Sequence, residues 1–249
     1  MGAKRVTGPR IVIVQDADDI GQVGADLVAD AIARNPAASI TAATGESPMG
    51  LYSALAERYR SGAFETNAVT VFQLDEYLGL MPGDRRSLLG WMRRSFLRPL
   101  GVDAGRVVPL TGDGDPRVAC AAFDQAIEAR GSLDIAILGL GRNGHLGFNE
   151  PPSAAESPTR VVELSAVTLE DNARYWGRVA DVPTRAVTMG MRNLLRARQV
   201  VLVASGEVKR AIVRRALEGP VEPEVPASLL RTAEADVTVI VDRAAWGDR

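Results

Sequence analysis

Short apolar runs alternate along the chain with segments whose apolar residues recur at helical spacing. The apolar runs are of strand length, lie between turn residues, and cover residues 10–15, 39–43, 69–74, 107–110, 134–140, 160–164, 186–189, 199–204 and 237–241. The segments with a period of three to four residues predict helices over residues 18–34, 48–60, 86–98, 117–130, 168–176 and 207–217, and a further helix that ends at residue 196. Strands that alternate with helices predict an α/β fold with an open, mostly parallel Rossmann-like sheet and helices on both faces.

Several elements carry signals for their ends. Ser47 is expected to cap the helix that follows it, with Pro48 at the first helical position, and Gly219 is expected to close the helix 207–217. Residues 1–9 are polar, and we expect them to be disordered. The chain has no internal repeat, and its 249 residues fit one α/β domain over residues 1–249.

Composition excludes several classes of protein. A net charge of −2, with 24% charged residues, indicates neither nucleic acid nor an anionic membrane as a partner. No apolar stretch is long enough to span a bilayer, and no hydrophobic signal core precedes the first strand, so we expect a cytoplasmic protein. One cysteine, Cys120, and one histidine argue against a disulfide framework and against a zinc or iron site.

The most informative stretch is the loop after the strand 134–140. With the last residues of that strand, it holds the chain's single histidine, His145, four glycines at positions 139, 141, 144 and 147, and the carboxylate of Glu150. Imidazole titrates near neutrality and glycine lets the backbone approach a ligand, so an acid/base site is indicated. A capped turn with a surface histidine is the alternative. The glycines and the polar pair Asn143 and Asn149 favour the functional interpretation.

Two more polar motifs follow predicted strands. Thr44, Gly45, Glu46 and Ser47 precede a helix, and Asp75 ends the strand 69–74. Ligands of open α/β sheets bind beyond the carboxyl ends of the strands, where these motifs and the histidine loop would meet. The 44–47 turn suits an anion, although a plain helix start is an equal alternative and Glu46 weighs against a phosphate. Asp75 could be a helix cap or, if desolvated, a base.

Two cations complete the candidate set. Lys209 lies in the first turn of a predicted helix, where the helix dipole disfavours a cation unless it holds an anion there. An exposed lysine is the alternative interpretation. Arg174 lies in another segment, the helix 168–176. The arginines between residues 85 and 98 fit either a solvated helix face or a contact between subunits, so a homo-oligomer stays open.

Six segments together resemble the glucosamine-6-phosphate deaminase family, within the wider group that includes 6-phosphogluconolactonase. The likeness runs from about residue 11 to residue 243 and is carried by ATGESPMGLY (43–52), LDEYLGL (74–80), LGLGRNGHLGFNEP (138–151), DNARYW (171–176), AVTMGMRNLL (186–195) and SGEVK (205–209). The third segment is the most specific, because lactonases resemble it only as far as the histidine.

The resemblance implies a cofactor-free conversion of glucosamine 6-phosphate and water to fructose 6-phosphate and ammonia. It implies that His145 opens the sugar ring, oriented by Glu150 and Asn143, and that Asp75 moves a proton from C2 to C1. It places the substrate phosphate against the 44–47 turn, Arg174 and Lys209, and it implies no metal.

Several positions depart from the family pattern. Many relatives carry Asp at Asn143, a small residue at Glu46 and Tyr at Leu88; Arg231 lies in an altered segment, and Val162 replaces the Lys of allosterically regulated relatives. These changes leave the exact sugar and any allosteric activation open. A lactonase of the same fold and a non-catalytic sugar-phosphate-binding protein are the alternative functions.

Overall fold

Seven strands form a parallel sheet at the centre of the computed structural model, which describes residues 8–80, 83–110 and 115–247. Most of the segment predicted to be disordered, residues 1–7, lies outside the described residues. In their order across the sheet, the strands are β1 (Arg10–Val14), β10 (Asp236–Asp242), β9 (Gln199–Ala204), β6 (Ile135–Gly139), β2 (Ser39–Ala42), β3 (Thr70–Gln73) and β5 (Val107–Val108). Every pairing in this sheet is parallel, which confirms the predicted fold class.

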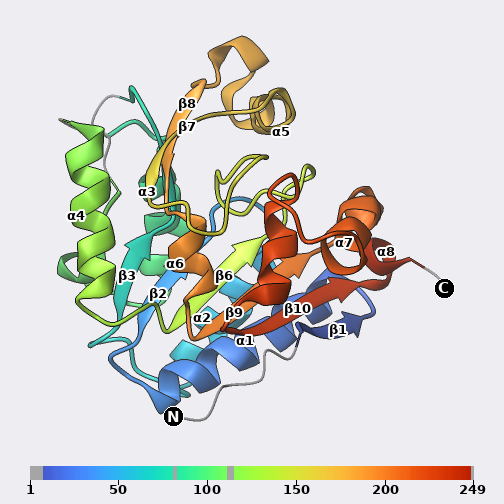
Figure 1. The fold of residues 1–249 in the computed structure, drawn as a ribbon. Helices are drawn as coiled ribbons and strands as arrows, with labels where there is room; N and C mark the ends of the chain where they lie inside the picture. Colours follow the sequence, from blue (N-terminus) through green and yellow to red (C-terminus); the bar gives the residue numbers. More distant parts are fainter. Residues whose placement is uncertain (1–7, 81–82, 111–114, 248–249) are drawn as a thin grey trace.

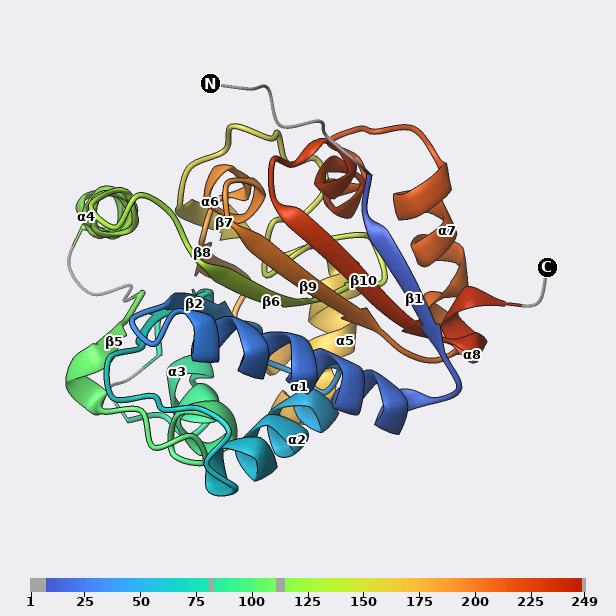
Figure 2. The ribbon, with the colours of Figure 1, turned by 90° about the horizontal axis from the view of Figure 1, so that it is seen from below.

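Helices cover both faces of the parallel sheet (Figure 2). On one face, α1 (Ala17–Arg34), α2 (Met49–Arg60) and α3 (Leu88–Met92) pack on side chains such as Ile135 and Ile137. On the other face, α4 (Pro116–Glu128), α6 (Met191–Leu195) and α7 (Arg210–Glu218) pack on side chains such as Ala136 and Leu138. Successive residues of a strand point to opposite faces, so β6 is apolar throughout because both of its faces are covered.

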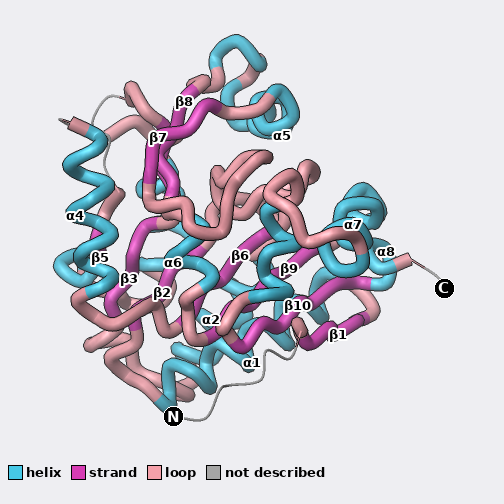
Figure 3. The backbone as a smooth tube through the Cα atoms, viewed as in Figure 1, coloured by secondary structure: helices cyan, strands magenta, loops and turns pink. Residues whose placement is uncertain are grey.

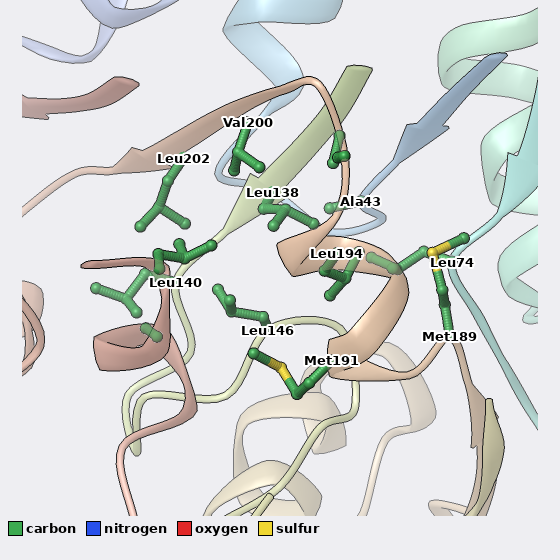
Figure 4. Packing of buried hydrophobic residues seen from close by; sticks show 14 of the residues in the cluster. Ala43, Leu74, Leu138, Leu140, Leu146, Met189, Met191, Leu194, Val200 and Leu202 are labelled. Atoms are coloured by element: carbon green, nitrogen blue, oxygen red, sulfur yellow. The ribbon is translucent and has the colours of Figure 1, made fainter. Parts of the chain in front are cut away.

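The histidine loop is anchored in one of these cores. Leu146, directly after His145, is fully buried and packs among Leu138, Leu140 and Leu202 (Figure 4). Burial of one leucine side chain stabilises a fold by about 1.5–3 kcal/mol, so the loop is held in place by its own apolar residue.

A second sheet stands beside the parallel one and has three antiparallel strands. Its order is β4 (Asp75–Tyr77), β8 (Arg185–Thr188) and β7 (Arg160–Glu163), and α5 (Ala166–Trp176) follows β7 (Figures 1 and 3). The sequence analysis placed Asp75 at the end of the strand 69–74, which is wrong in this detail. The chain leaves the parallel sheet after β3, and Asp75 pairs with Thr188 in the small sheet.

Other differences concern the ends of helices. Ser47 does not cap α2: the helix begins after Pro48 with no side-chain cap, and Ser47 faces the cavity described below. The predicted helix 86–98 is α3 followed by a π-helical turn, Arg93–Leu97. The predicted helix 207–217 opens with a 3-10 turn, Glu207–Lys209, before α7. The sequence analysis did not predict a 3-10 segment, Pro226–Thr232, or the short α8 (Arg243–Trp246).

Candidate active site

The polar motifs meet where three neighbouring strands of the parallel sheet end. β6, β2 and β3 are adjacent, and the histidine loop, the 44–47 turn and Asp75 follow them in that order across the sheet. They surround a cavity of about 140 Å³. Among the residues predicted from the sequence, those that line it are Thr44, Gly45, Glu46, Ser47, Asp75, His145, Arg174 and Lys209.

Asp75 is a buried carboxylate with an unused acceptor. Its residue is 4% exposed, and its Oδ1 accepts no hydrogen bond within the described part of the chain. Burial, and then the charge of Glu76, raise the pKa of Asp75 to about 8, against a smaller opposing effect of the Thr44 hydroxyl. A carboxylate with one unpartnered oxygen and a pKa of about 8 suits proton transfer.

The backbone of the histidine loop approaches Asp75 closely at Gly147. This residue has φ +58°, and a Cβ there would lie 3.3 Å from Asp75 Oδ2. Glycine occupies the left-handed region without strain, and it leaves room for the carboxylate. Glycine is thus required here by neighbouring side chains of the protein, and the approach of the loop to a ligand stays a prediction.

His145 faces the cavity with its ring held from one side. Nδ1 lies 3.6 Å from Glu150 Oε2 and 3.3 Å from Thr168 Oγ1, at the start of α5. Nε2 has no hydrogen-bond partner in the described residues and lies against the backbone of Gly141, where a side chain would overlap the ring. One nitrogen is therefore oriented by the protein, and the other is available to a ligand.

Glu150 and Asn143 lie behind the imidazole and do not line the cavity. Asn143 Nδ2 donates to Glu150 Oε2 at 2.7 Å, and Asn143 Oδ1 accepts the His145 N–H at 3.1 Å. Burial alone would raise the pKa of Glu150; hydrogen bonding and charge from His145, with further hydrogen bonds from Thr168 and Asn143, lower it to about 2. Glu150 is thus an anion that orients the imidazole and stabilises its charged form.

Asn149, which the sequence analysis grouped with Asn143, plays a structural part instead. It is fully buried, and its Nδ2 donates to the carbonyls of Leu146 and Met189 at 2.9 and 2.8 Å. Its Oδ1 accepts from Arg160 Nη1 at 2.8 Å. These bonds join the histidine loop to the small sheet and fix the position of His145 relative to Asp75.

The 44–47 turn presents free backbone donors. No hydrogen bond within the described residues uses the N–H groups of Thr44, Gly45, Glu46 or Ser47. Together with the N-terminus of α2, they form an anion-binding geometry. Lys209 Nζ reaches this end of the cavity from the turn after β9 and donates to the Leu140 carbonyl at 2.7 Å. Burial is the main reason that the pKa of Lys209 is lowered.

Arg174 lies opposite the turn and is already paired. Its Nη1 is 2.6 Å from Glu46 Oε2, with both side chains more than half exposed. The structure therefore brings both predicted cations to the turn, and it also places there the acid that weighed against a phosphate. The described residues contain no group of three or more His, Cys, Asp and Glu that could hold a metal ion.

Some residues at the site were not singled out by the sequence analysis. Thr168 contacts the imidazole, and its only sequence signal was its place three residues after Ser165, the N-cap of α5. Phe148 and Trp176 both pack against Tyr77, of which the sequence analysis noted only its place in the 74–80 segment. The sequence pattern gave no sign that these three aromatic side chains would be in contact, because they come from three separate segments.

A profile of the family described as glucosamine-6-phosphate isomerases/6-phosphogluconolactonase matches residues 15–239. The chain belongs to this family. The resemblance stated from the motifs is thereby confirmed.

Members of this family with curated names are close in sequence over nearly the full length. Glucosamine-6-phosphate deaminase of Streptomyces coelicolor is 41% identical over 237 residues, which cover 94% of this chain and 90% of the relative. Glucosamine-6-phosphate deaminase of Cellvibrio japonicus is 38% identical and covers 95% of this chain and 90% of its own length.

Solved structures of members of this family are also similar to this chain. A monomeric glucosamine-6-phosphate deaminase superposes with a TM-score of 0.91 at 35% identity and covers 95% of this chain and 98% of its own. A 6-phosphogluconolactonase from Trypanosoma cruzi has a TM-score of 0.75 at 24% identity, which shows a shared fold. In the described part of the chain, no helix is both long and apolar enough to cross a membrane.

Proposed function

We propose that this chain is a glucosamine-6-phosphate deaminase, which converts glucosamine 6-phosphate and water to fructose 6-phosphate and ammonia. One observation carries the proposal: a buried carboxylate with an unpartnered oxygen, Asp75, shares one cavity with an oriented imidazole and with two cations. The relatives at 35–41% identity that bear this name support it.

The substrate phosphate binds at the end of the cavity with free donors. The N–H groups of the 44–47 turn, Lys209 and Arg174 supply hydrogen bonds to its oxygens. Charge-assisted hydrogen bonds of this kind contribute roughly 1.5–3 kcal/mol each. The phosphate therefore fixes C6 at one end and leaves C1 and C2 for the groups deeper in the cavity.

Ring opening is the task of His145. The ring oxygen must gain a proton while the C1 hydroxyl loses one, and an imidazole with a free Nε2 can exchange both protons in turn. Glu150 stabilises the imidazolium that forms, and Asn143 holds Glu150 in place. The product of this step is the open-chain amino aldehyde.

Asp75 then moves the proton from C2 to C1. Its carboxylate takes the C2 proton and leaves an enol-type intermediate, and return of the proton to C1 gives a ketimine at C2. Water adds to the ketimine and ammonia departs, which leaves the ketone. The water oxygen becomes the ketone oxygen, and its two hydrogens leave with the nitrogen as ammonia. The proton transfers at the ring oxygen, C1 and C2 use side chains of this chain, without a cofactor.

The direct test is incubation with glucosamine 6-phosphate, reading ammonia and fructose 6-phosphate together. Equal amounts of both products are expected. A lactonase would instead hydrolyse 6-phosphogluconolactone and release no ammonia, and a binding protein would retain the sugar unchanged. Either of these results would contradict the proposal. A homo-oligomer and a cytoplasmic location stay predictions, to be tested by light scattering and by fractionation.

A further inference from the structure

A second cavity, of about 220 Å³, lies next to the active-site cavity. The two share wall residues: Thr44, Gly45, Asn172 and Tyr175. Apolar and aromatic side chains form most of its surface, and three arginines, Arg85, Arg86 and Arg94, also line it. We call it the arginine pocket. Its position makes it a direct extension of the substrate cavity.

The small sheet sets this continuity. Asp75 and Tyr77 are two residues apart on β4, so their side chains point to the same face. Asp75 lines the active-site cavity and Tyr77 lines the arginine pocket. A group attached to the substrate near the carbons that meet Asp75 would therefore extend over Tyr77 into the pocket.

The charge of the pocket selects its ligand. No acidic residue lines it among the described residues. Arg86 is bound by Asp84 at 2.7 Å and stacks on Trp176 at 4.3 Å, so its charge is partly neutralised. Arg85 and Arg94 make no ion pair within the described part of the chain. Two guanidinium groups thus have no counter-charge among the residues that the structure describes.

Arg94 also has donors to spare. One of its Nη atoms donates to the Arg85 carbonyl at 3.2 Å, and this is its only side-chain hydrogen bond to the described residues. Guanidinium groups bind carboxylates through paired N–H donors. The combination of Leu88 and aromatic walls with two uncompensated arginines fits a short apolar linker that ends in a carboxylate.

We propose that the arginine pocket is a substrate subsite for a carboxylate-bearing ether on O3 or O4 of an amino-sugar 6-phosphate. This inference rests on the proposed function, which also limits the point of attachment. C1 must become an aldehyde, C2 must carry the free amine that leaves, the C5 oxygen closes the ring, and C6 bears the phosphate. O3 and O4 remain, and the ether passes unchanged into the product.

The test compares matched substrates. Ammonia release gives kcat/KM for glucosamine 6-phosphate, for its 3-O- and 4-O-carboxymethyl ethers, and for the corresponding neutral carboxamide ethers. We expect one acidic ether to exceed its carboxamide by about tenfold or more, which corresponds to roughly 1.4 kcal/mol. The carboxamide has nearly the same size, so this ratio isolates the charge.

Variants assign the effect to the pocket. The double variant Arg85→Gln, Arg94→Gln is expected to bring the acid-to-amide ratio close to one. Arg98→Gln is the matched control, because Arg98 is exposed on the same segment and does not line the pocket. Leu88→Phe narrows the pocket. It is expected to lower kcat/KM for the acidic ether and for its carboxamide alike, relative to glucosamine 6-phosphate.

Contrary outcomes are separable from failure of the proposed function. If glucosamine 6-phosphate is deaminated but neither acidic ether exceeds its amide, or the ratio survives in the double variant, the subsite does not exist. If free glycolate changes the kinetics of glucosamine 6-phosphate through Arg85 and Arg94, the pocket takes a separate anion and the proposal is wrong. If no sugar is deaminated, the proposed function is wrong, and the subsite is tested by calorimetric titration of the same ether pairs. Tighter binding of the acidic ether that is lost in the double variant would support the subsite, and equal binding of acid and amide would contradict it.

Discussion

The carboxylate of Glu46, a residue of the turn that presents free N–H donors, lies 2.6 Å from the Arg174 guanidinium. Glu46 thus already forms an ion pair with Arg174, the cation that a substrate phosphate would contact. Both side chains are more than half exposed, so the pair itself contributes little to stability. A phosphate dianion can displace Glu46 from Arg174 because it also accepts hydrogen bonds from the backbone N–H groups of the turn. The phosphate must nevertheless compete with the Glu46 carboxylate and bind close to its negative charge.

Removal of the Glu46 charge is therefore expected to tighten phosphate binding. In Glu46→Gln, KM for the phosphorylated sugar and the inhibition constant of inorganic phosphate should both fall several-fold, because one charge at ion-pair distance near a surface contributes about 1 kcal/mol. Glu57→Gln, at an exposed position on α2, is the control. The gain should vanish when Arg174 is also replaced by Ala; unchanged phosphate inhibition would contradict the prediction.

Lys209 is expected to matter more to phosphate affinity than Arg174. No carboxylate lies at ion-pair distance from Lys209 in the described residues, whereas Arg174 must first leave Glu46. Loss of one charge-assisted hydrogen bond of roughly 1.5–3 kcal/mol predicts that Lys209→Met raises KM about tenfold or more. Arg174→Ala should raise it less. Steady-state kinetics and calorimetry with inorganic phosphate would settle the order, and equal effects would disprove it.

The pH profile should report Asp75. A base must be ionised, and burial together with the Glu76 charge raises the pKa of Asp75 to about 8. We therefore expect kcat/KM to rise with pH up to about 8. Glu76→Gln removes a charge that raises this pKa, so its acid limb should move to lower pH. Glu65→Gln, at an exposed site, should leave the profile in place, and a profile that is flat between pH 6 and 8 would rule out this base.

Asp75→Asn should abolish turnover while leaving substrate binding largely intact, since an amide keeps the shape but accepts no proton. The loss is expected to be on the order of a hundredfold or more.

The same substitution should raise the stability of the fold at high pH. The raised pKa means that the folded state holds a proton that the unfolded state releases between about pH 4 and 8, so stability falls across that window.

The variant lacks this titration. It should therefore gain free energy of unfolding relative to the native sequence as pH rises from 4 to 8, by on the order of 1 kcal/mol or more. Urea denaturation at several pH values measures the difference. A difference that does not change with pH would show that Asp75 ionises as freely in the fold as in the unfolded chain.

The single histidine allows a direct test of its pairing with Glu150. Imidazole resonances in an NMR spectrum belong to His145 without ambiguity. Glu150→Gln removes the anion 3.6 Å from Nδ1, so the His145 resonances should shift, and the imidazolium that forms during ring opening loses a stabilising partner. The rate with the cyclic sugar should therefore fall, and the rate with an open-chain substrate should fall less. Unchanged His145 resonances would exclude the pair.

The alternation of strands and helices was enough to predict the parallel sheet, because fully covered strands such as β6 read as unbroken apolar runs. It could not reveal that Asp75 belongs to a second sheet. β4 has three residues, directly follows β3 in the chain, and acquires its partner from β8, more than a hundred residues later. Such pairing depends on tertiary contacts that no local period reports.

The site shows the same limit. Adjacent acids in the sequence have different tasks: Asp75 faces the cavity, whereas Glu76 accepts the N–H groups of Leu88 and Leu89 at 2.9 and 3.0 Å and fixes the start of α3. The two amides also differ: Asn143 contacts His145 and Glu150, whereas Asn149 joins the histidine loop to the small sheet. Residue type indicated the chemistry, but the direction of each side chain depends on neighbours brought together by the fold.

Thr188 joins the two sheets at the site. It pairs with Asp75 across the small sheet, and its hydroxyl accepts the Phe148 N–H of the histidine loop at 3.1 Å. The 44–47 turn and Lys209, which we propose to bind the phosphate, belong to loops of the parallel sheet, while the proposed base, Asp75, belongs to the antiparallel one. Substitutions in the small sheet are therefore expected to alter the chemistry at C2, and those in the loops of the larger sheet to alter the affinity for the phosphate.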